Sequence, residues 1–222
     1  MMNNRLYWVI IPAYNESAYL ERVLKKVKKV WPSFIVIDDG SSDNTAKMAQ
    51  KLAPHVLTHT VNLGKGAALK TGCEYAFKHL KAKGVVFFDA DDQHDPKCIP
   101  LMIKQLEQYP VVLGVRSFNN QMPFVRILFN RVSSIITLLL FGRYIPDIPS
   151  GFKAISKAAY KKVKWQSCDY LVEMEIASNV AKYKIPFTEV SIPTIYHDLD
   201  RGMTVLDILH MLYQMLLWRI NR

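Results

Sequence analysis

Residues 85–92 read Val-Val-Phe-Phe-Asp-Ala-Asp-Asp, an apolar run that passes directly into acid. Val and Phe favour strands, and a short run without a polar position predicts a strand buried on both faces. Such strands are typical of parallel sheets covered by helices, where ligands bind beyond the carboxyl ends of the strands. We therefore expect the acidic run 89–96 to lie at a binding site.

The same pattern recurs on both sides of this stretch. Further strands are predicted at 8–11, 34–37, 55–58 and 111–115, alternating with helices at 20–30, 45–52, 67–80 and 96–106. Later elements are an apolar helix at 124–141, a loop and strand at 147–156, a helix at 170–182, a β-rich run at 187–195 and a terminal helix at 205–220. The alternation predicts an α/β fold with a mostly parallel sheet flanked by helices.

Composition favours one domain spanning residues 1–222. The chain is 50% hydrophobic, enough for one sizeable core. Its three cysteines are widely spaced, which indicates reduced thiols, and no signal peptide or membrane-spanning run is visible, so we expect a cytoplasmic protein. A net charge of +10 suits anionic partners such as nucleotides, lipid headgroups or nucleic acid.

Three acidic or aromatic loops follow predicted strands, at 12–16, 38–43 and 89–95. Carboxylates crowded at one edge of a sheet repel one another, and a divalent cation relieves that repulsion. Asp89 and Asp91 lie two residues apart and offer the hard oxygen ligands that Mg²⁺ or Mn²⁺ prefers. As a Lewis acid, such an ion would stabilise a departing diphosphate.

Four ordered motifs carry a resemblance to a known family. They are Ile-Pro-Ala-Tyr-Asn-Glu at 11–16, Ile-Asp-Asp-Gly-Ser-Ser-Asp-Asn-Thr at 37–45, Asn-Leu-Gly-Lys-Gly at 62–66 and Asp-Ala-Asp at 89–91. The chain resembles family 2 glycosyltransferases of the GT-A fold. Within them it is most similar to the dolichol-phosphate mannose synthase group, which glycosylates polyprenyl phosphates.

The resemblance implies a role for individual residues. The base and ribose of a nucleotide sugar would be bound by Pro12, Tyr14, Glu16, Ile37 and Asp39. The rest of the donor would be bound by Asp89, Ala90, Asp91, Arg116 and Arg201, with a metal on Asp89, Asp91 and Gln93. The turn at 64–66 fits either a tight turn before a helix or a donor contact. The loop 201–204, Arg-Gly-Met-Thr, lacks the lysine that ends the family's corresponding loop.

The arginines favour a phosphate acceptor on separate grounds. A phosphate nucleophile brought to a diphosphate donor suffers strong repulsion, which Arg116, Arg131 and Arg201 could offset. Arg131 stands in an otherwise apolar helix, where the alternative is a surface arginine that extends to solvent. We therefore assign Arg116 and Arg131 to the acceptor phosphate, and Arg131 and Asp91 to catalysis.

A base is needed only for a different acceptor. A phosphate acceptor is already ionised at neutral pH, whereas a sugar hydroxyl would need a general base, for which Asp147 or one of the carboxylates of the acidic loops is the candidate. His94 and His197 are alternatives. These residues distinguish transfer to a lipid phosphate from transfer to a saccharide.

The terminal helix has a wide apolar face, with Trp218 and Arg219 near its end. This pattern fits peripheral docking on a membrane, and packing in the core or against a second copy are the alternatives. We predict an inverting hexosyltransferase that uses GDP-mannose or UDP-glucose type donors and a polyprenyl phosphate at the cytoplasmic leaflet. Residues 1–115 would form the donor half, and residues 116–222 the acceptor half with its membrane-interface helices.

Three other functions were weighed. The first is a glycosyltransferase of the same fold that acts on a saccharide hydroxyl. The second is a sugar nucleotidyltransferase, which the absence of a glycine-rich loop after the first strand disfavours. The third is a basic nucleic-acid-binding module, in which the acidic loops would repel phosphate. We expect no nucleic-acid partner and see no sign of an obligatory protein partner.

Overall fold

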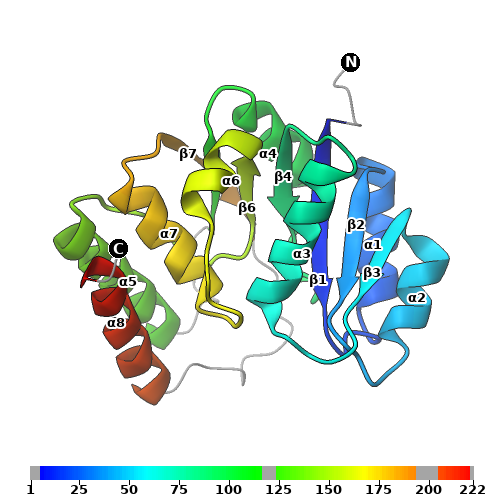
Figure 1. The fold of residues 1–222 in the computed structure, drawn as a ribbon, viewed down its shortest axis with the longest axis horizontal. Helices are drawn as coiled ribbons and strands as arrows, with labels where there is room; N and C mark the ends of the chain where they lie inside the picture. Colours follow the sequence, from blue (N-terminus) through cyan, green and yellow to red (C-terminus); the bar gives the residue numbers. More distant parts are fainter. Residues whose placement is uncertain (1–5, 117–123, 194–204, 221–222) are drawn as a thin grey trace.

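The computed structural model describes residues 6–116, 124–193 and 205–220. Its centre is a seven-stranded sheet in the order β3-β2-β1-β4-β6-β5-β7, with helices on both faces (Figure 1). The strands are β1 (Tyr7–Ala13), β2 (Phe34–Asp38), β3 (His55–Thr58), β4 (Gly84–Phe87), β5 (Val111–Arg116), β6 (Lys153–Ser156) and β7 (Phe187–Ile192). The helices are α1 (Leu20–Val30), α2 (Thr45–Leu52), α3 (Lys65–Lys78), η1 (Pro96–Cys98), α4 (Ile99–Leu106), α5 (Phe124–Phe141), α6 (Lys157–Val163), α7 (Val172–Lys182) and α8 (Val205–Ile220).

The expected mostly parallel sheet and single α/β domain are confirmed. Strands β3, β2, β1 and β4 run parallel, as do β5 and β7, whereas β6 is antiparallel to both of its neighbours. Because β6 runs the other way, it begins at the edge where β4 ends. The loop that precedes β6 is thereby brought against the acidic run, and a side chain on Gly151 would collide with the Asp89 carboxylate.

The strands are buried on both faces, as their unbroken apolar runs predict. Ile10 and Ile37 belong to the core layer beneath α3, while Val9 and Ile11 belong to the layer under α1. Gly72 allows α3 to approach the sheet closely, since a Cβ there would lie 2.6 Å from a methyl group of Ile10. Strands β1 and β2 are therefore rigidly placed, and the loops at their ends inherit that position.

Most predicted elements are present, with two differences. The region 96–106 is divided into η1 and α4, and α6 (Lys157–Val163) was not predicted. Helix α6 has only seven residues, too few for a periodic pattern, and it begins where the Ser156 hydroxyl accepts the Ala159 N–H. The three cysteines are free thiols, as expected.

Helices α5, α7 and α8 pack together at one end of the sheet (Figure 1). Met211 and Met215 of α8 are fully buried in the core. One face of the terminal helix thus packs in the core, which was one of the two alternatives to membrane docking. Within the described residues, no helix combines the length and the apolar character that crossing a bilayer demands.

The contact between α3 and the sheet gives a test of the fold. Gly72→Val should lower the free energy of unfolding by about 1–3 kcal/mol, because the added methyl groups overlap Ile10 and Ile37. Urea denaturation measures the effect. Lys78→Val, at an exposed position of the same helix, is the matched control and should change stability by less than about 1 kcal/mol.

Candidate active site

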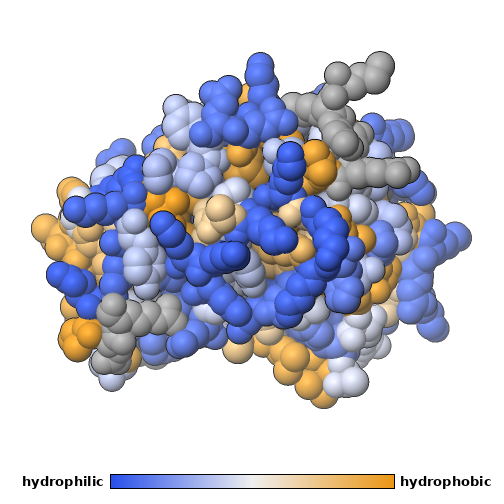
Figure 2. Space-filling model, turned by 45° about the horizontal axis from the view of Figure 1, so that its top comes forward, coloured by the Kyte–Doolittle hydropathy of each residue, from blue (hydrophilic) through white to orange (hydrophobic). Residues whose placement is uncertain are grey.

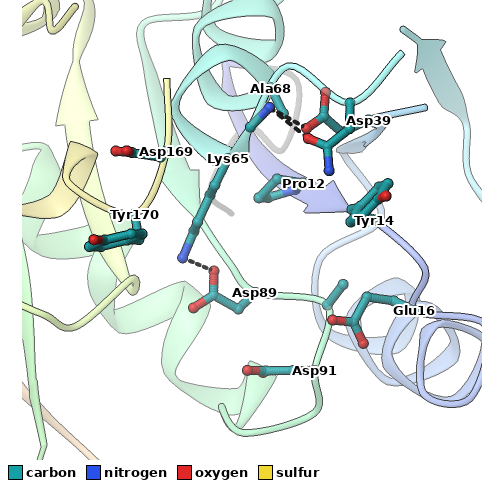
Figure 3. A pocket seen from close by; sticks show the side chains of 14 residues that line it. Pro12, Tyr14, Glu16, Asp39, Lys65, Ala68, Asp89, Asp91, Asp169 and Tyr170 are labelled. Carbon is teal, nitrogen blue, oxygen red and sulfur yellow. Dashed lines mark hydrogen bonds and ion pairs between the residues drawn. The ribbon is translucent and has the colours of Figure 1, made fainter. Parts of the chain in front are cut away.

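A pocket of about 400 Å³ opens at the carboxyl ends of β1, β2 and β4. Figure 3 shows Tyr14 and Glu16 on one side, Asp169 and Tyr170 on the other, and Asp89 and Asp91 facing the space between them. The lining residues are Pro12, Ala13, Tyr14, Glu16, Asp39, Asn62, Gly64, Lys65, Ala68, Asp89, Ala90, Asp91, Asp169 and Tyr170. The three strand-end loops therefore converge, as their order along the chain predicted.

The loops after β1 and β2 are joined by hydrogen bonds. The Asn15 N–H donates to the Ser41 hydroxyl at 3.0 Å, and the Glu16 N–H donates to the Thr45 hydroxyl at 2.8 Å. Asn15 has a φ of 55°, a conformation that asparagine tolerates better than most residues. This turn leaves Tyr14 45% exposed at the mouth of the pocket, where its ring is available for stacking.

Asp39 follows β2 directly and lines the pocket. Its carboxylate accepts the Leu63 and Gly64 N–H groups at 3.0 and 2.7 Å and lies 2.6 Å from Nδ1 of His59. The other ring nitrogen of His59 lies 2.9 Å from the Thr71 hydroxyl. Asp39 thus ties the 62–64 turn to the end of β2.

Lys65 crosses the pocket and binds two carboxylates. Its ammonium lies 2.6 Å from Asp89 (Figure 3) and 2.7 Å from Glu173 of α7. Burial acts to raise the pKa of Asp89, but Lys65 and a hydrogen bond from His94 outweigh it and hold that pKa well below its usual range. Burial acts to lower the pKa of Lys65, and the two carboxylates raise it instead. Lys65 and Asp89 are therefore both charged near neutral pH.

The two acids that follow behave differently from Asp89. Burial, reinforced by the negative charge of Asp89, raises the pKa of Asp91, although the Gln93 N–H donates to it at 3.1 Å. Asp92 instead turns away to α1, where Arg22 and Lys26 each approach it at 2.8 Å. Asp91 is thus the member of the run whose ionisation the folded protein disfavours.

These two facts fit a divalent cation at Asp89 and Asp91. The Lys65 ammonium already occupies a cation position on Asp89, and the pKa of Asp91 is raised first by burial and then by the negative charge of Asp89, both of which a bound cation would counteract. Across the described residues, no three His, Cys, Asp or Glu side chains converge on a common metal position. The protein would therefore supply two carboxylates, with water and donor phosphates completing the shell, as is usual for Mg²⁺. The predicted ligand Gln93 does not line the pocket, and its role stays a prediction.

A later loop closes the pocket on the side opposite Tyr14. The Cys168 carbonyl accepts the Gly66 N–H at 2.6 Å and the Ala67 N–H at 3.3 Å, at the start of α3. The Trp165 indole donates back to the Gly66 carbonyl at 2.8 Å. Buried Glu175 accepts the N–H groups of residues 166 and 167, so that the 165–170 loop is fixed from both sides. Asp169 and Tyr170 owe their place in the pocket to these contacts.

Arg116 and Asp147 bind each other. The guanidinium donates to the carboxylate at 2.6 and 2.9 Å, the Arg116 N–H donates at 2.7 Å, and the Asn130 amide adds a bond at 2.8 Å. The Asp147 side chain is fully buried. Both of its oxygens are engaged, so this geometry gives no support to the predicted base role of Asp147.

The remaining predicted residues lie apart from the pocket or outside the described chain. Ile37 is fully buried in the core, and Arg131 is exposed on α5; neither lines the pocket. His94 is buried between Phe88 and Phe152, with Nε2 3.5 Å from Asp89. Arg201 and His197 fall outside the described residues. The roles predicted for these side chains stay predictions.

The chain matches the family model for glycosyl transferase family 2 over residues 8–164, which include all the strand-end loops of the pocket. The protein belongs to glycosyl transferase family 2. Solved structures support the same fold. Glucosyl-3-phosphoglycerate synthase from Mycobacterium tuberculosis, in complex with Mn²⁺, UDP-glucose and phosphoglyceric acid, superposes with a TM-score of 0.74 at 22% identity, over 98% of this chain and 80% of that chain.

Sequence relatives indicate which group within family 2 this protein is similar to. It is 32% identical to UDP-N-acetylglucosamine–dolichyl-phosphate N-acetylglucosaminyltransferase from Methanococcus voltae, over 100% of this chain and 99% of the relative. It is 27% identical to dolichol-phosphate mannosyltransferase from Pyrococcus furiosus, over 95% of this chain and 63% of the relative. The expected resemblance to the polyprenyl-phosphate group is confirmed.

Several pocket residues escaped prediction. Asn62 and Lys65 stand in a motif whose pattern fits either a turn or a donor contact, and Asp169 and Tyr170 lie in no recognised motif. Glu173 lies beyond the segment that matches the family model. A lysine between two glycines at a helix start was the available signal for Lys65, whereas its partner Glu173 follows only from the fold.

The Arg116–Asp147 pair provides a second test. Asp147→Asn keeps the shape and tolerates the φ of 43° at this position, but it removes the negative charge that the largely buried Arg116 guanidinium contacts. We expect the free energy of unfolding to fall by about 2–3 kcal/mol, measured by urea denaturation. The matched control is Glu107→Gln, which neutralises an exposed acid. Loss of glycosyl transfer with unchanged stability would instead restore the base role.

Proposed function

We propose that this family 2 glycosyltransferase moves a hexose from a nucleoside diphosphate sugar to a polyprenyl phosphate, with Mg²⁺ or Mn²⁺ as cofactor. The single observation that carries the proposal is the pocket that Asp89 and Asp91 line together with Tyr14 and Glu16. One side offers an aromatic ring and a carboxylate to a nucleoside, and the other offers a cation position to a diphosphate. A pocket of about 400 Å³ is of the size that small-molecule sites have.

The donor site depends on the protein's own residues in three ways. Tyr14 and Pro12 form a wall against which a base can lie, and Asp39 holds the 62–64 turn, which lines the same pocket. Asp89 and Asp91 hold the cation, which supplies Lewis-acid stabilisation of the departing diphosphate. The fixed loops require little rearrangement, so that the site is organised before the donor arrives.

The acceptor assignment rests on the relatives and on charge. The Methanococcus voltae and Pyrococcus furiosus relatives carry names that specify dolichyl phosphate as acceptor. A phosphate acceptor needs no strong base, which agrees with the engagement of Asp147 by Arg116. The saccharide-hydroxyl alternative requires a base that this geometry does not offer at Asp147. Family membership also favours sugar transfer over the nucleotidyltransferase alternative.

An apolar surface on α5 and α8 supports peripheral docking on a membrane. Its members are exposed although large and hydrophobic, and they are Leu128, Ile135, Leu138 and Leu139 on α5 with Tyr213, Leu216 and Ile220 on α8. Leu139 and Ile220 are each 76% exposed. In Figure 2 hydrophilic side chains cover most of the visible face, and hydrophobic groups show at its left margin, toward the end where α5 lies in Figure 1, and at its lower edge. We call these seven residues the α5/α8 surface and assign it to the membrane interface.

The test of the function supplies vesicles that contain a polyprenyl phosphate, Mn²⁺ and a panel of radiolabelled GDP- and UDP-sugars. We expect label from one donor class to enter the organic-extractable fraction. Label that appears only in a water-soluble glycan, when saccharide acceptors are offered in parallel, would assign the acceptor to the hydroxyl alternative.

Asp91→Asn should lower the transfer rate by about a hundredfold or more, since one of two protein ligands to the cation is lost. Because the fold raises the pKa of Asp91, the ionised carboxylate costs stability near neutral pH, and the amide should leave thermal stability equal or higher. Rate assays and thermal unfolding measure the two effects. The control Glu107→Gln should retain full activity, and an equally active Asp91→Asn enzyme would exclude the metal role.

Leu139→Asp should weaken binding to vesicles of phosphatidylcholine and phosphatidylglycerol by about tenfold, because a charge replaces an apolar anchor. Co-sedimentation measures this. Leu101→Asp, on the exposed face of α4 and outside the α5/α8 surface, is the control and should bind as the wild type does. If Leu139→Asp dissociated a dimer and left vesicle binding intact, the surface would belong to a contact between two copies.

A further inference from the structure

Lys65 sits where two functions compete for one carboxylate. Its ammonium lies 2.6 Å from Asp89, and Asp89 is also one of the two carboxylates that fit a divalent cation. An ammonium and a divalent cation at bonding distance from the same carboxylate repel each other strongly, because both are positively charged. The structure therefore shows the site with an internal cation already in place.

Glu173 gives Lys65 a second partner that does not belong to the cation position. It lies 2.7 Å from the same ammonium, its side chain is only 8% exposed, and it comes from α7 on the far side of the pocket. Glu173 does not line the pocket, whereas Asp89 does. A lysine that leaves Asp89 would thus keep one short ion pair and would not be stranded without a counter-charge.

We propose that Lys65 is an internal substitute for the metal: it neutralises Asp89 in the free enzyme and retreats to Glu173 alone when the cation binds. This proposal rests on the proposed function, since it takes Asp89 to be a metal ligand. Lys65 and Glu173 are then positioning residues, which act on the cation site through Asp89. A cation thus neutralises Asp89 both with and without bound metal. Because the metal must displace Lys65, the affinity for metal in the absence of nucleotide is low.

The two residues should change metal affinity in opposite directions. Without Lys65, no ammonium competes with the metal for Asp89. Lys65→Met should therefore bind Mn²⁺ about tenfold more tightly than the wild type in the absence of nucleotide. Without Glu173, the displaced lysine has no second partner, so Glu173→Gln should bind Mn²⁺ about three- to tenfold more weakly. Electron paramagnetic resonance of free Mn²⁺ measures both, and requires no turnover.

Simple charge attraction at a distance would give the same two signs, and the double variant separates the explanations. If Glu173 acts through Lys65, the effect of Glu173→Gln should largely disappear in the Lys65→Met background. An unchanged effect in that background would overturn the transfer to Glu173. Lys78→Met, which removes a positive charge at the other end of α3, is the matched control and should leave Mn²⁺ affinity unchanged.

Stability provides a readout if a variant folds poorly. Lys65→Met leaves Asp89 and Glu173 without their shared counter-charge, so Mn²⁺ should raise its melting temperature more than it raises that of the wild type. Lys65→Met that bound Mn²⁺ no more tightly than the wild type would overturn the proposal.

A second arm adds UDP or GDP to each variant. If the wild type bound Mn²⁺ with a nucleotide and only the Lys65 effect were missing, the exchange would fail and the proposed function would stand. If the wild type bound no Mn²⁺ even with either nucleotide, both would fail.

Discussion

Negative charge crowds the carboxyl ends of the strands, and the fold meets it with cations brought from other elements. The pairs are Arg22 and Lys26 of α1 with Asp92, Lys65 of α3 with Asp89, and Arg116 of β5 with Asp147. Each pair links a loop to an element distant in the sequence, so that charge compensation also fixes the loop in space. Burial and the neighbouring charge of Asp89 raise the pKa of Asp91, which lines the pocket. Ion pairs thus fix the loops of the site, whereas the negative charge of Asp91 is disfavoured in the folded protein. A bound cation would stabilise that charge.

Local patterns predicted the parts of the site that local sequence determines. Apolar runs located the strands, and because parallel strands end at one edge, Tyr14, Asp39 and Asp89 could be placed together. Contacts between distant segments could not be predicted from local patterns. One example is the ion pair between Lys65 of α3 and Glu173 of α7. The same limit applied to Asp147, because its acidic character was visible while its burial against Arg116 depends on how β5 and the 147–152 loop meet.

The two ends of the sheet differ in what they carry. The end formed by β1 to β4 holds the pocket walls and buries its helices α1 and α3 against the strands. The other end carries α5 and α8, whose inward faces complete the core while the α5/α8 surface stays uncovered. Under the proposed function, the first end would bind the soluble nucleotide sugar, and the second would lie against the membrane that holds the lipid acceptor. Among the described residues, no helix is long and apolar enough to span that membrane.

The contact between α3 and the 165–170 loop has a consequence for the tolerance of this chain to change. Side chains on Gly64 or Gly66 would overlap backbone atoms of residues 167 and 168, so neither glycine can be replaced unless the loop moves. Surface loops commonly accept insertions, yet this one is anchored at Trp165, Cys168 and Glu175 within a few residues. Length variation among variants or engineered chimeras should therefore be excluded from this loop, which acts as a fixed-length spacer between the helix and the rest of the domain.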